Sequence, residues 1–271
     1  YVGGVQISST GYWTTGSDGT VTSAGNTQPG DNYIHYDAGN NTLTLHNATI
    51  KEEVPYNTST YVAGAAIGVL NQHGNAELTI QLEGSNTIDE VSTGIYVLAH
   101  SQNTGSSSLT ITGNGSLNAS SSFNPGIGVQ SNSGDSTLTI QNAEVTTTSA
   151  HNDGVRVQSG AQKSASLTVE GGSLTATGSG ATFAGIQLQF GSGVSGSGTP
   201  TVTVSNNAIV RANGGIANNS STSIQYGTGN EENGGIVFDG KNGTVYGDVT
   251  LQEDLEIGTD ETLTIPEGAS L

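Results

Sequence analysis

A short motif of alternating apolar and threonine residues returns about every thirty residues along this chain. Its copies read LTLHNATI (43–50), LTIQLEGSNTI (78–88), LTITGNGSL (109–117), LTIQNAEV (138–145), LTVEGGSL (167–174) and VTVSNNAI (202–209). A second series alternates with them: AIGV (66–69), GIYV (94–97), GIGV (126–129), GVRV (154–157), GIQL (185–188) and GGIA (214–217). Repeats of this length indicate a solenoid, in which each unit buries its apolar face against the next.

The motif has the two-residue period of a strand with one buried face. In LTI, Leu and Ile are expected to point inward and Thr outward. Residues that tolerate a left-handed backbone follow the motif at Asn47, Gly113, Asn142, Gly171 and Asn206, and such residues turn tight corners. The sequence therefore predicts an all-β protein, a right-handed parallel β-helix with three-strand coils of about thirty residues and an N-terminal cap.

The two ends of the chain depart from the repeat. Residues 1–36 contain Trp13 and several tyrosines, which predicts a bulky cap on the stack of coils. Residues 37–240 are predicted to form the parallel coils. Residues 241–271 show apolar pairs at closer spacing, which predicts shorter coils that continue beyond Leu271.

The charge balance excludes several classes of partner. Lys and Arg total 5 against 23 Asp and Glu, giving a net charge of −18, and such a surface repels nucleic acid and anionic lipid. No apolar run is long enough to cross a bilayer, so we expect no nucleic-acid partner and no membrane insertion of this segment. The absence of cysteine excludes disulfides and thiol chemistry. Acidity with little Lys and much Thr, Asn, Ser and Gly indicates an exported bacterial protein, extracellular or at the cell surface.

Three stretches carry a resemblance to a known group of proteins. YDAGNNTLTLHNATI (36–50), the GIxV strands and the ending LTIPEGASL (263–271) resemble bacterial cell-surface right-handed parallel β-helix proteins. These are described as carbohydrate-binding or adhesion proteins and share a fold with pectate lyases. The resemblance implies the same fold and a polysaccharide or host glycan as partner. The acidic-plus-arginine signatures of pectate lyases and the NTD, DD, GHG and RIK motifs of polygalacturonases are absent from the sequence, so no catalytic residue is assigned.

The outward positions of the GIxV series form the first candidate ligand site. They are Gly68, Tyr96, Gly128, Arg156 and Gln187. The glycine at position 128 predicts a notch about 10 Å wide between Tyr96 and Arg156, with His151 and Asp153 at the neighbouring corner. The alternative is an ordinary polar surface in which Arg156 pairs with Asp153.

The loop 51–64 provides the second candidate ligand site. It is longer than the matching connection in most coils and contains Tyr56 and Tyr61, amphipathic rings of the kind that stack on sugars. The alternative is that both rings pack against the N-terminal cap.

An outward threonine row is a third feature of the repeat. Thr44, Thr79, Thr110, Thr139, Thr168 and Thr203 are expected to stack one per coil. Such an array could match ice or a polysaccharide. The alternative, which the nearby His46, Glu77 and Glu170 favour, is that Thr simply suits an exposed strand.

No cofactor or metal is expected. GSGVSG (191–196) leads into another strand instead of a helix, which predicts a flexible corner and no dinucleotide site. The acids between Asp248 and Glu267 lack calcium-loop spacing, and the histidines lack zinc-ligand spacing.

The sequence thus favours a non-enzymatic, exported or cell-surface module that functions in glycan binding or adhesion and acts as a monomer. The alternatives are a passive structural stalk and a polysaccharide lyase or hydrolase with an unrecognised site, since fold alone does not decide function.

Overall fold

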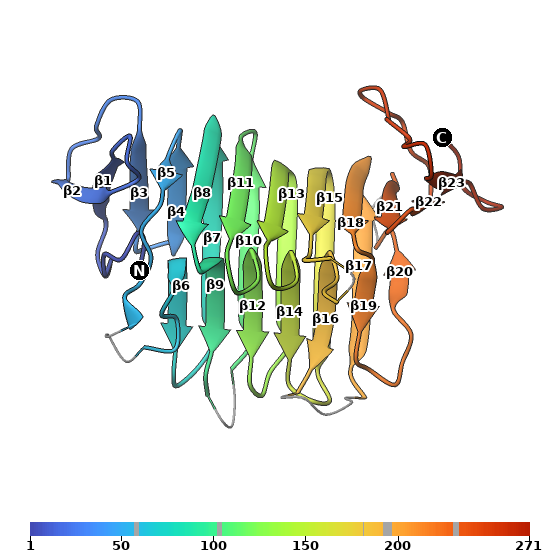
Figure 1. The fold of residues 1–271 in the computed structure, drawn as a ribbon, viewed down its shortest axis with the longest axis horizontal. Coiled ribbons are helices and arrows are strands. Elements are labelled where there is room, and N and C mark those ends of the chain that lie inside the picture. The colour runs from blue at the N-terminus through green and yellow to red at the C-terminus, as the bar shows by residue number, and fades with distance from the viewer. Residues whose placement is uncertain (57–59, 102–104, 181, 192–196, 230–232) are drawn as a thin grey trace.

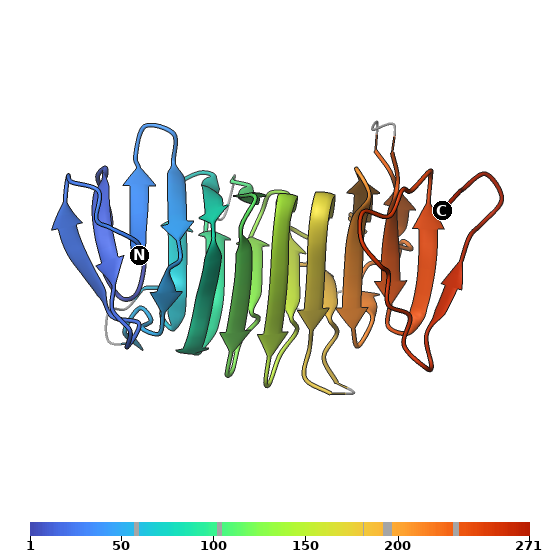
Figure 2. The ribbon, with the colours of Figure 1, turned by 90° about the horizontal axis from the view of Figure 1, so that it is seen from above.

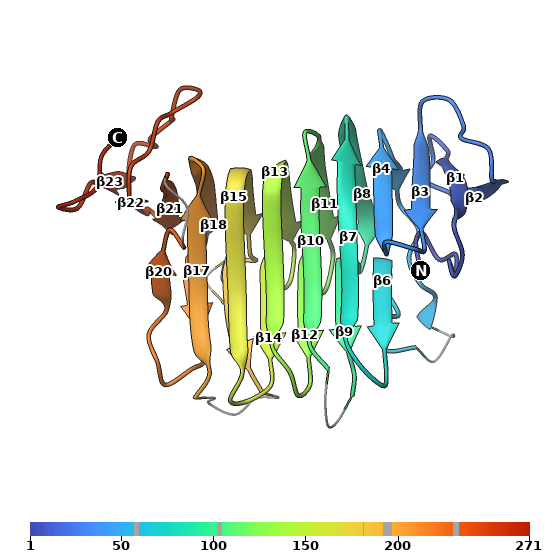
Figure 3. The same cartoon turned by 180° about the vertical axis from the view of Figure 1, so that it is seen from behind.

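A computed structural model describes residues 1–56, 60–101, 105–180, 182–191, 197–229 and 233–271. It confirms the predicted fold class. The protein is all-β, with no α-helix among the described residues, and parallel coils of about 29 residues stack into a β-solenoid of about six turns. The coils wind right-handedly along the long axis of the molecule (Figures 1 and 3).

One face of the solenoid is a parallel sheet built from the GIxV series. Its strands are β6 (Ala65–Asn71), β9 (Thr93–Ala99), β12 (Ile127–Ser131), β14 (Val155–Ser159), β16 (Ile186–Phe190) and β19 (Ile216–Asn218). They lie side by side in the order of the chain (Figure 1).

The LTI motifs form the opposite face, which Figure 3 shows from outside. It contains β4 (Thr42–His46), β7 (Ala76–Glu83), β10 (Ser107–Gly113), the first halves of β13 (Ser136–Ser149) and β15 (Ser164–Thr177), β17 (Thr199–Ser205) and β20 (Gln225–Gly227).

A third face closes each coil. It contains β5 (Thr49–Ile50), β8 (Ser85–Val91), β11 (Ser116–Ser121), the second halves of β13 and β15, β18 (Ala208–Asn213) and β21 (Gly235–Asp239). The three faces enclose one continuous apolar core.

The inward and outward assignment of the LTI motif is confirmed. Leu138 and Ile140 are fully buried, whereas Thr139 between them is partly exposed. Successive coils place like residues beside one another, so that Ile140 pairs with Ile111 on one side and with Val169 on the other. A shift of one residue would turn every apolar side chain outward, and burial therefore fixes this register.

The prediction of the outward threonine row is wrong at one position. Thr79, Thr110, Thr139, Thr168 and Thr203 are in register, but Thr42 stands beside Thr79 while Thr44 lies beside Gln81. β4 is also the second strand of an antiparallel hairpin with β3 (Tyr33–Asp37), and it meets β7 two residues out of the repeat register. A shift of two keeps the same faces inward, so the sequence pattern does not reveal it.

The predicted corner residues adopt the left-handed conformation. The φ angles of Asn47, Asn142 and Asn206 are 48°, 54° and 53°, and those of Gly113 and Gly171 are 112° and 70°. Asn tolerates this region better than other side-chain-bearing residues. These residues let the chain turn from the second face to the third in successive coils.

Antiparallel strands lie at both ends of the stack (Figure 2). β1 (Gly11–Thr15) pairs with β2 (Val21–Gly25) and β3, and β3 covers the edge of β4. At the other end, β21 pairs with β22 (Asn242–Tyr246), which is followed by β23 (Thr262–Thr264). Pairing of this kind leaves the open edges of the coils less exposed to other chains. No helix in the described ranges is long and apolar enough to cross a membrane.

Candidate functional site

The outward row of the GIxV sheet forms in the predicted register. Gly68, Tyr96, Gly128, Arg156 and Gln187 stand side by side on β6, β9, β12, β14 and β16. Gly128 leaves a gap in this row, and a Cβ atom there would lie 2.9 Å from Cδ2 of Tyr96. The ring of Tyr96 therefore lies over Gly128, and the absence of a side chain at Gly128 allows this close approach.

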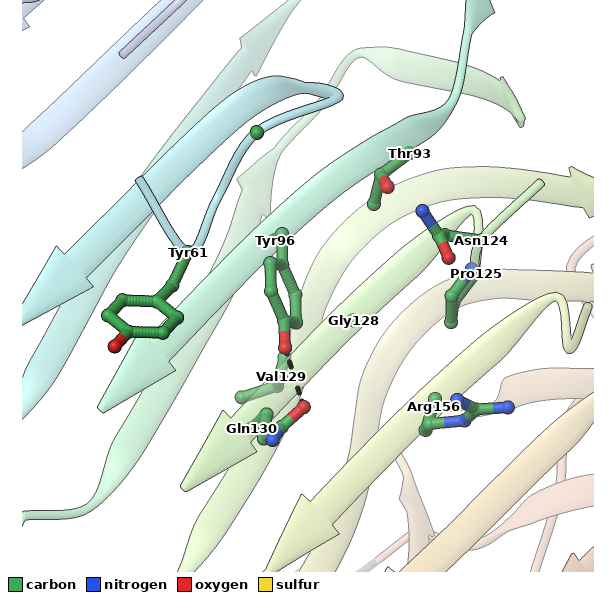
Figure 4. Close-up of a pocket in the computed structure, with 10 residues that line it drawn as sticks. Tyr61, Thr93, Tyr96, Asn124, Pro125, Gly128, Val129, Gln130 and Arg156 are labelled. Carbon is green, nitrogen blue, oxygen red and sulfur yellow. Dashed lines mark hydrogen bonds between the residues drawn. The ribbon is translucent and has the colours of Figure 1, made fainter. Parts of the chain in front are cut away.

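A pocket of about 250 Å³ lies at this gap. Tyr96, Gly128 and Arg156 line it, and so does Tyr61 from the loop before β6. In Figure 4, the two tyrosines lie next to each other at one side of the pocket and Arg156 lies at the other. The structure thus joins one residue of the second candidate site to the first.

The ring of Tyr61 is held at the rim by a histidine. Tyr61 stacks on His100, with ring centroids 3.7 Å apart and an interplanar angle of 20°. The side chain is nevertheless 55% exposed. One aromatic face is therefore supported by protein while much of the ring stays accessible. Tyr56, from the same loop, is 63% exposed and does not line the pocket; residues 57–59 between them lie outside the described part of the chain.

Tyr96 is more deeply placed than Tyr61. Its hydroxyl donates a hydrogen bond to Oε1 of Gln130, with an O–O distance of 2.5 Å. Burial raises the pKa of Tyr96 to about 12, an effect that the positive charge of Arg156 partly opposes. The phenol is therefore neutral throughout the physiological range and acts as a hydrogen-bond donor.

The pKa of Tyr96 can be tested by alkaline titration. We expect the tyrosinate absorbance removed by Tyr96→Phe to develop near pH 12, well above the ordinary tyrosine value of about 10. Because the unfolded chain loses this proton first, the free energy of unfolding should fall as the pH rises from about 10 to about 12. A Tyr96 transition near pH 10 would contradict the burial described here.

Arg156 forms an ion pair with Asp153. This is the alternative that was predicted from the sequence for the first candidate site. Nη2 and Nε of Arg156 lie 2.6 Å and 2.9 Å from Oδ2 of Asp153, and Nη2 also donates to Oδ1 of Asn152 at 2.5 Å. Asp153 is buried behind the arginine and does not line the pocket. The guanidinium consequently points away from the two tyrosines (Figure 4).

His151 lies apart from the pocket. It is exposed, its Nδ1 is 2.7 Å from the backbone oxygen of Ser122, and its ring stacks on Phe123 with centroids 5.7 Å apart. Phe123 is itself 63% exposed. The pair forms an aromatic surface at the corner that precedes β12 and β14.

The sequence interpretation missed four polar or rim residues of the pocket. They are Thr93, Asn124, Pro125 and Gln130. Thr93 and Gln130 belong to β9 and β12, and Asn124 and Pro125 form the turn before β12. The only signal for the turn is the sequence NPG at 124–126, which marks a corner but no ligand.

Two further pockets have a different character. One, of about 350 Å³, lies between the N-terminal segment and the first coils and is lined mainly by apolar side chains. The other, of about 510 Å³, lies between β18 and the C-terminal segment, where Arg211 pairs with Glu261 at 3.0 Å. Of the residues named for the candidate sites, only Gly68 lines either of them, at the edge of the first. Among the described residues, no three His, Asp or Glu side chains group as metal ligands, and of GSGVSG only Gly191 is described.

Fold and site together define a right-handed parallel β-helix with a tyrosine-lined pocket on one flat face. A comparison of the chain with protein-family models, curated proteins and solved structures finds no match. The parallel β-helix is thus shown by the structure itself, and the finer resemblance to cell-surface carbohydrate-binding proteins stays a prediction.

Proposed function

We propose that this chain is a non-enzymatic, exported module that binds a glycan in the pocket between Tyr61, Tyr96 and Arg156. The carrying observation is that two tyrosine rings, Tyr61 and Tyr96, line one pocket, with Tyr96 lying over Gly128. Sugar rings pack their apolar faces on aromatic side chains, and their hydroxyls bond to amide and hydroxyl groups. The side chains of Gln130, Thr93 and Asn124 provide such groups at the same pocket.

The lining residues support binding better than hydrolysis. Glycoside hydrolases use a pair of carboxyl groups flanking the scissile bond. In the described pocket the ionisable lining groups are Tyr61, Tyr96 and Arg156. The nearest predicted acid, Asp153, is buried in its pair with Arg156.

The proposal includes display outside a bacterial cell. Its support is compositional: net charge −18, 5 Lys and Arg, and 41 Gly, together with a repeat fold that presents one long surface. A single small site gives modest affinity, and many copies on one surface would add avidity.

The test compares tyrosine variants by titration calorimetry against a panel of plant and host glycans. Aromatic stacking on planar ligands is worth about 1–3 kcal/mol per ring, so Tyr61→Ala combined with Tyr96→Ala should weaken binding at least tenfold. Tyr56→Ala is the matched control, because Tyr56 belongs to the same loop but lies outside the pocket. We expect it to change the affinity by less than about twofold.

The outcomes separate the competing functions. Equal losses of glycan affinity in Tyr56→Ala and in the double variant would place the binding site on the loop that contains Tyr56. Failure of every glycan to bind would favour the alternative function, a passive structural stalk. Steady release of reducing or unsaturated sugar from a polysaccharide would establish an enzyme instead.

A further inference from the structure

We propose that the pocket selects neutral sugars and discriminates against uronic and other acidic sugars, because the charge of Arg156 is already neutralised within the protein. This inference rests on the proposed glycan-binding function and names the ligand class of that same pocket. An exposed arginine beside tyrosine rings would by itself indicate an anionic ligand. The contacts of Arg156 with Asp153 and Asn152 indicate a neutral ligand instead.

Asp153 occupies the Nε–Nη2 edge of the guanidinium, one of the two edges that could hold a ligand carboxylate. Its Oδ2 accepts hydrogen bonds from both Nε and Nη2 of Arg156, at 2.9 Å and 2.6 Å. A planar guanidinium pairs most strongly along an edge that presents two donors. Nη2 is also bonded to Oδ1 of Asn152, so this edge is fully used.

The carboxylate of Asp153 is fixed in place. Its side chain is only 3% exposed, and its other oxygen, Oδ1, accepts the backbone N–H of Ala184 in the next coil at 3.1 Å. Removing Asp153 from Arg156 would leave a buried charge without its partner, which is costly. Asp153 therefore stays with Arg156 when a ligand arrives.

An acidic sugar in the pocket would find no net positive charge to attract it. Arg156 lines the pocket, but its charge is cancelled by Asp153 behind it, and an anion that leaves water without a paired cation loses hydration free energy. Of the five Lys and Arg residues, Lys51, Arg211 and Lys241 also pair with described carboxylates. The net charge of −18 adds a long-range repulsion.

A neutral sugar avoids this repulsion and still uses the remaining groups. Figure 4 shows Tyr61, Tyr96 and Gln130 at one side, and Thr93 and Asn124 at the other. The aliphatic stem of Arg156 contributes apolar surface, since its charged end points away from the rings. These groups are suited to sugar hydroxyls and C–H faces.

The experiment measures binding of matched neutral and acidic oligosaccharides to the intact chain. The pairs are galactose oligomers against oligogalacturonates, and mannose oligomers against oligomannuronates, each of equal length. Titration calorimetry should give at least tenfold tighter binding for the neutral member. Asp153→Asn, which keeps the shape of the side chain and one oxygen acceptor but removes the charge, should reduce this ratio at least tenfold.

Glu144→Gln is the control for net charge. Glu144 is exposed on β13, on another face of the solenoid, and the substitution removes one negative charge without touching the pocket. The ratio should stay within about twofold of the wild-type value because exposed charges at long distance are screened. The affinity of the wild type for the acidic member should not fall as the salt concentration rises, because no unpaired positive charge attracts it; a fall would overturn the proposal even if Asp153→Asn does not fold.

The failures of the two proposals are distinguishable. If no member of any pair binds, both the proposed glycan-binding function and the proposed selectivity are overturned. Acidic members that bind as tightly as neutral ones would overturn the selectivity alone. An unchanged ratio in folded Asp153→Asn would overturn the role assigned to the Arg156–Asp153 pair.

Discussion

Replacing Ile140 with aspartate should lower the free energy of unfolding by about 3–5 kcal/mol, the scale of an uncompensated buried charge. Ile140 is 0% exposed and lies between Ile111 and Val169 in the shared core. No polar group replaces the lost hydration of the carboxylate there. Because stacked coils stabilise one another, the loss should spread to the neighbouring coils. Urea denaturation followed by circular dichroism measures it.

The control for this substitution is the adjacent residue. Thr139 points outward between Thr110 and Thr168 and is partly exposed, so Thr139→Asp places the same charge in contact with water. Surface changes of this kind usually alter stability by about 0.5 kcal/mol or less. Equal losses at positions 139 and 140 would contradict the inward and outward assignment.

The coil architecture was predictable because local patterns determine it. The two-residue alternation of LTI identifies the buried side chains, as Leu138 and Ile140 show, and the spacing of the copies gives the length of each coil. The corners were predictable from residue type alone, since Asn142 and Gly171 adopt positive φ where the strand bends. Each of these features depends on residues within one repeat.

The register of the first coil was not predictable in the same way. Thr44 belongs to a motif copy, yet it lies beside Gln81 because β4 is paired with β3 as well as with β7. Alternation fixes which face is buried but does not distinguish registers that differ by two residues. The pairing partners decide between them, and these come from a distant part of the chain.

The candidate site, like the fold, was predictable from the sequence only in part. The row containing Tyr96, Gly128 and Arg156 follows from the repeat and forms as predicted. Tyr61 joins it through a loop whose path no repeat determines, and its stack on His100 connects residues of different coils. Sequence spacing therefore placed the strand residues correctly but assigned Tyr61 to a separate site.

The pairing of Arg156 with Asp153 leads to the second large effect that we expect. Asp153→Ala should lower the free energy of unfolding by about 3 kcal/mol, since it breaks a largely buried pair. The arginine side chain is 27% exposed and would lose its bonds to Oδ2, and the backbone N–H of Ala184 would lose its acceptor. Asp153→Asn keeps the shape of the side chain and one of the two oxygen acceptors, so its loss of stability should be smaller. Urea denaturation of the three proteins measures the difference.

A surface pair provides the matched control for Asp153. Nζ of Lys241 lies 3.0 Å from Oδ2 of Asp260, but the two side chains are 68% and 76% exposed. Water already solvates both charges, so Asp260→Ala should change the free energy of unfolding by less than about 1 kcal/mol. If Asp153→Ala were as mild as Asp260→Ala, Asp153 would not hold Arg156 in its present orientation. The guanidinium would then be free to turn toward the tyrosines, and the pocket would present a positive charge to its ligand.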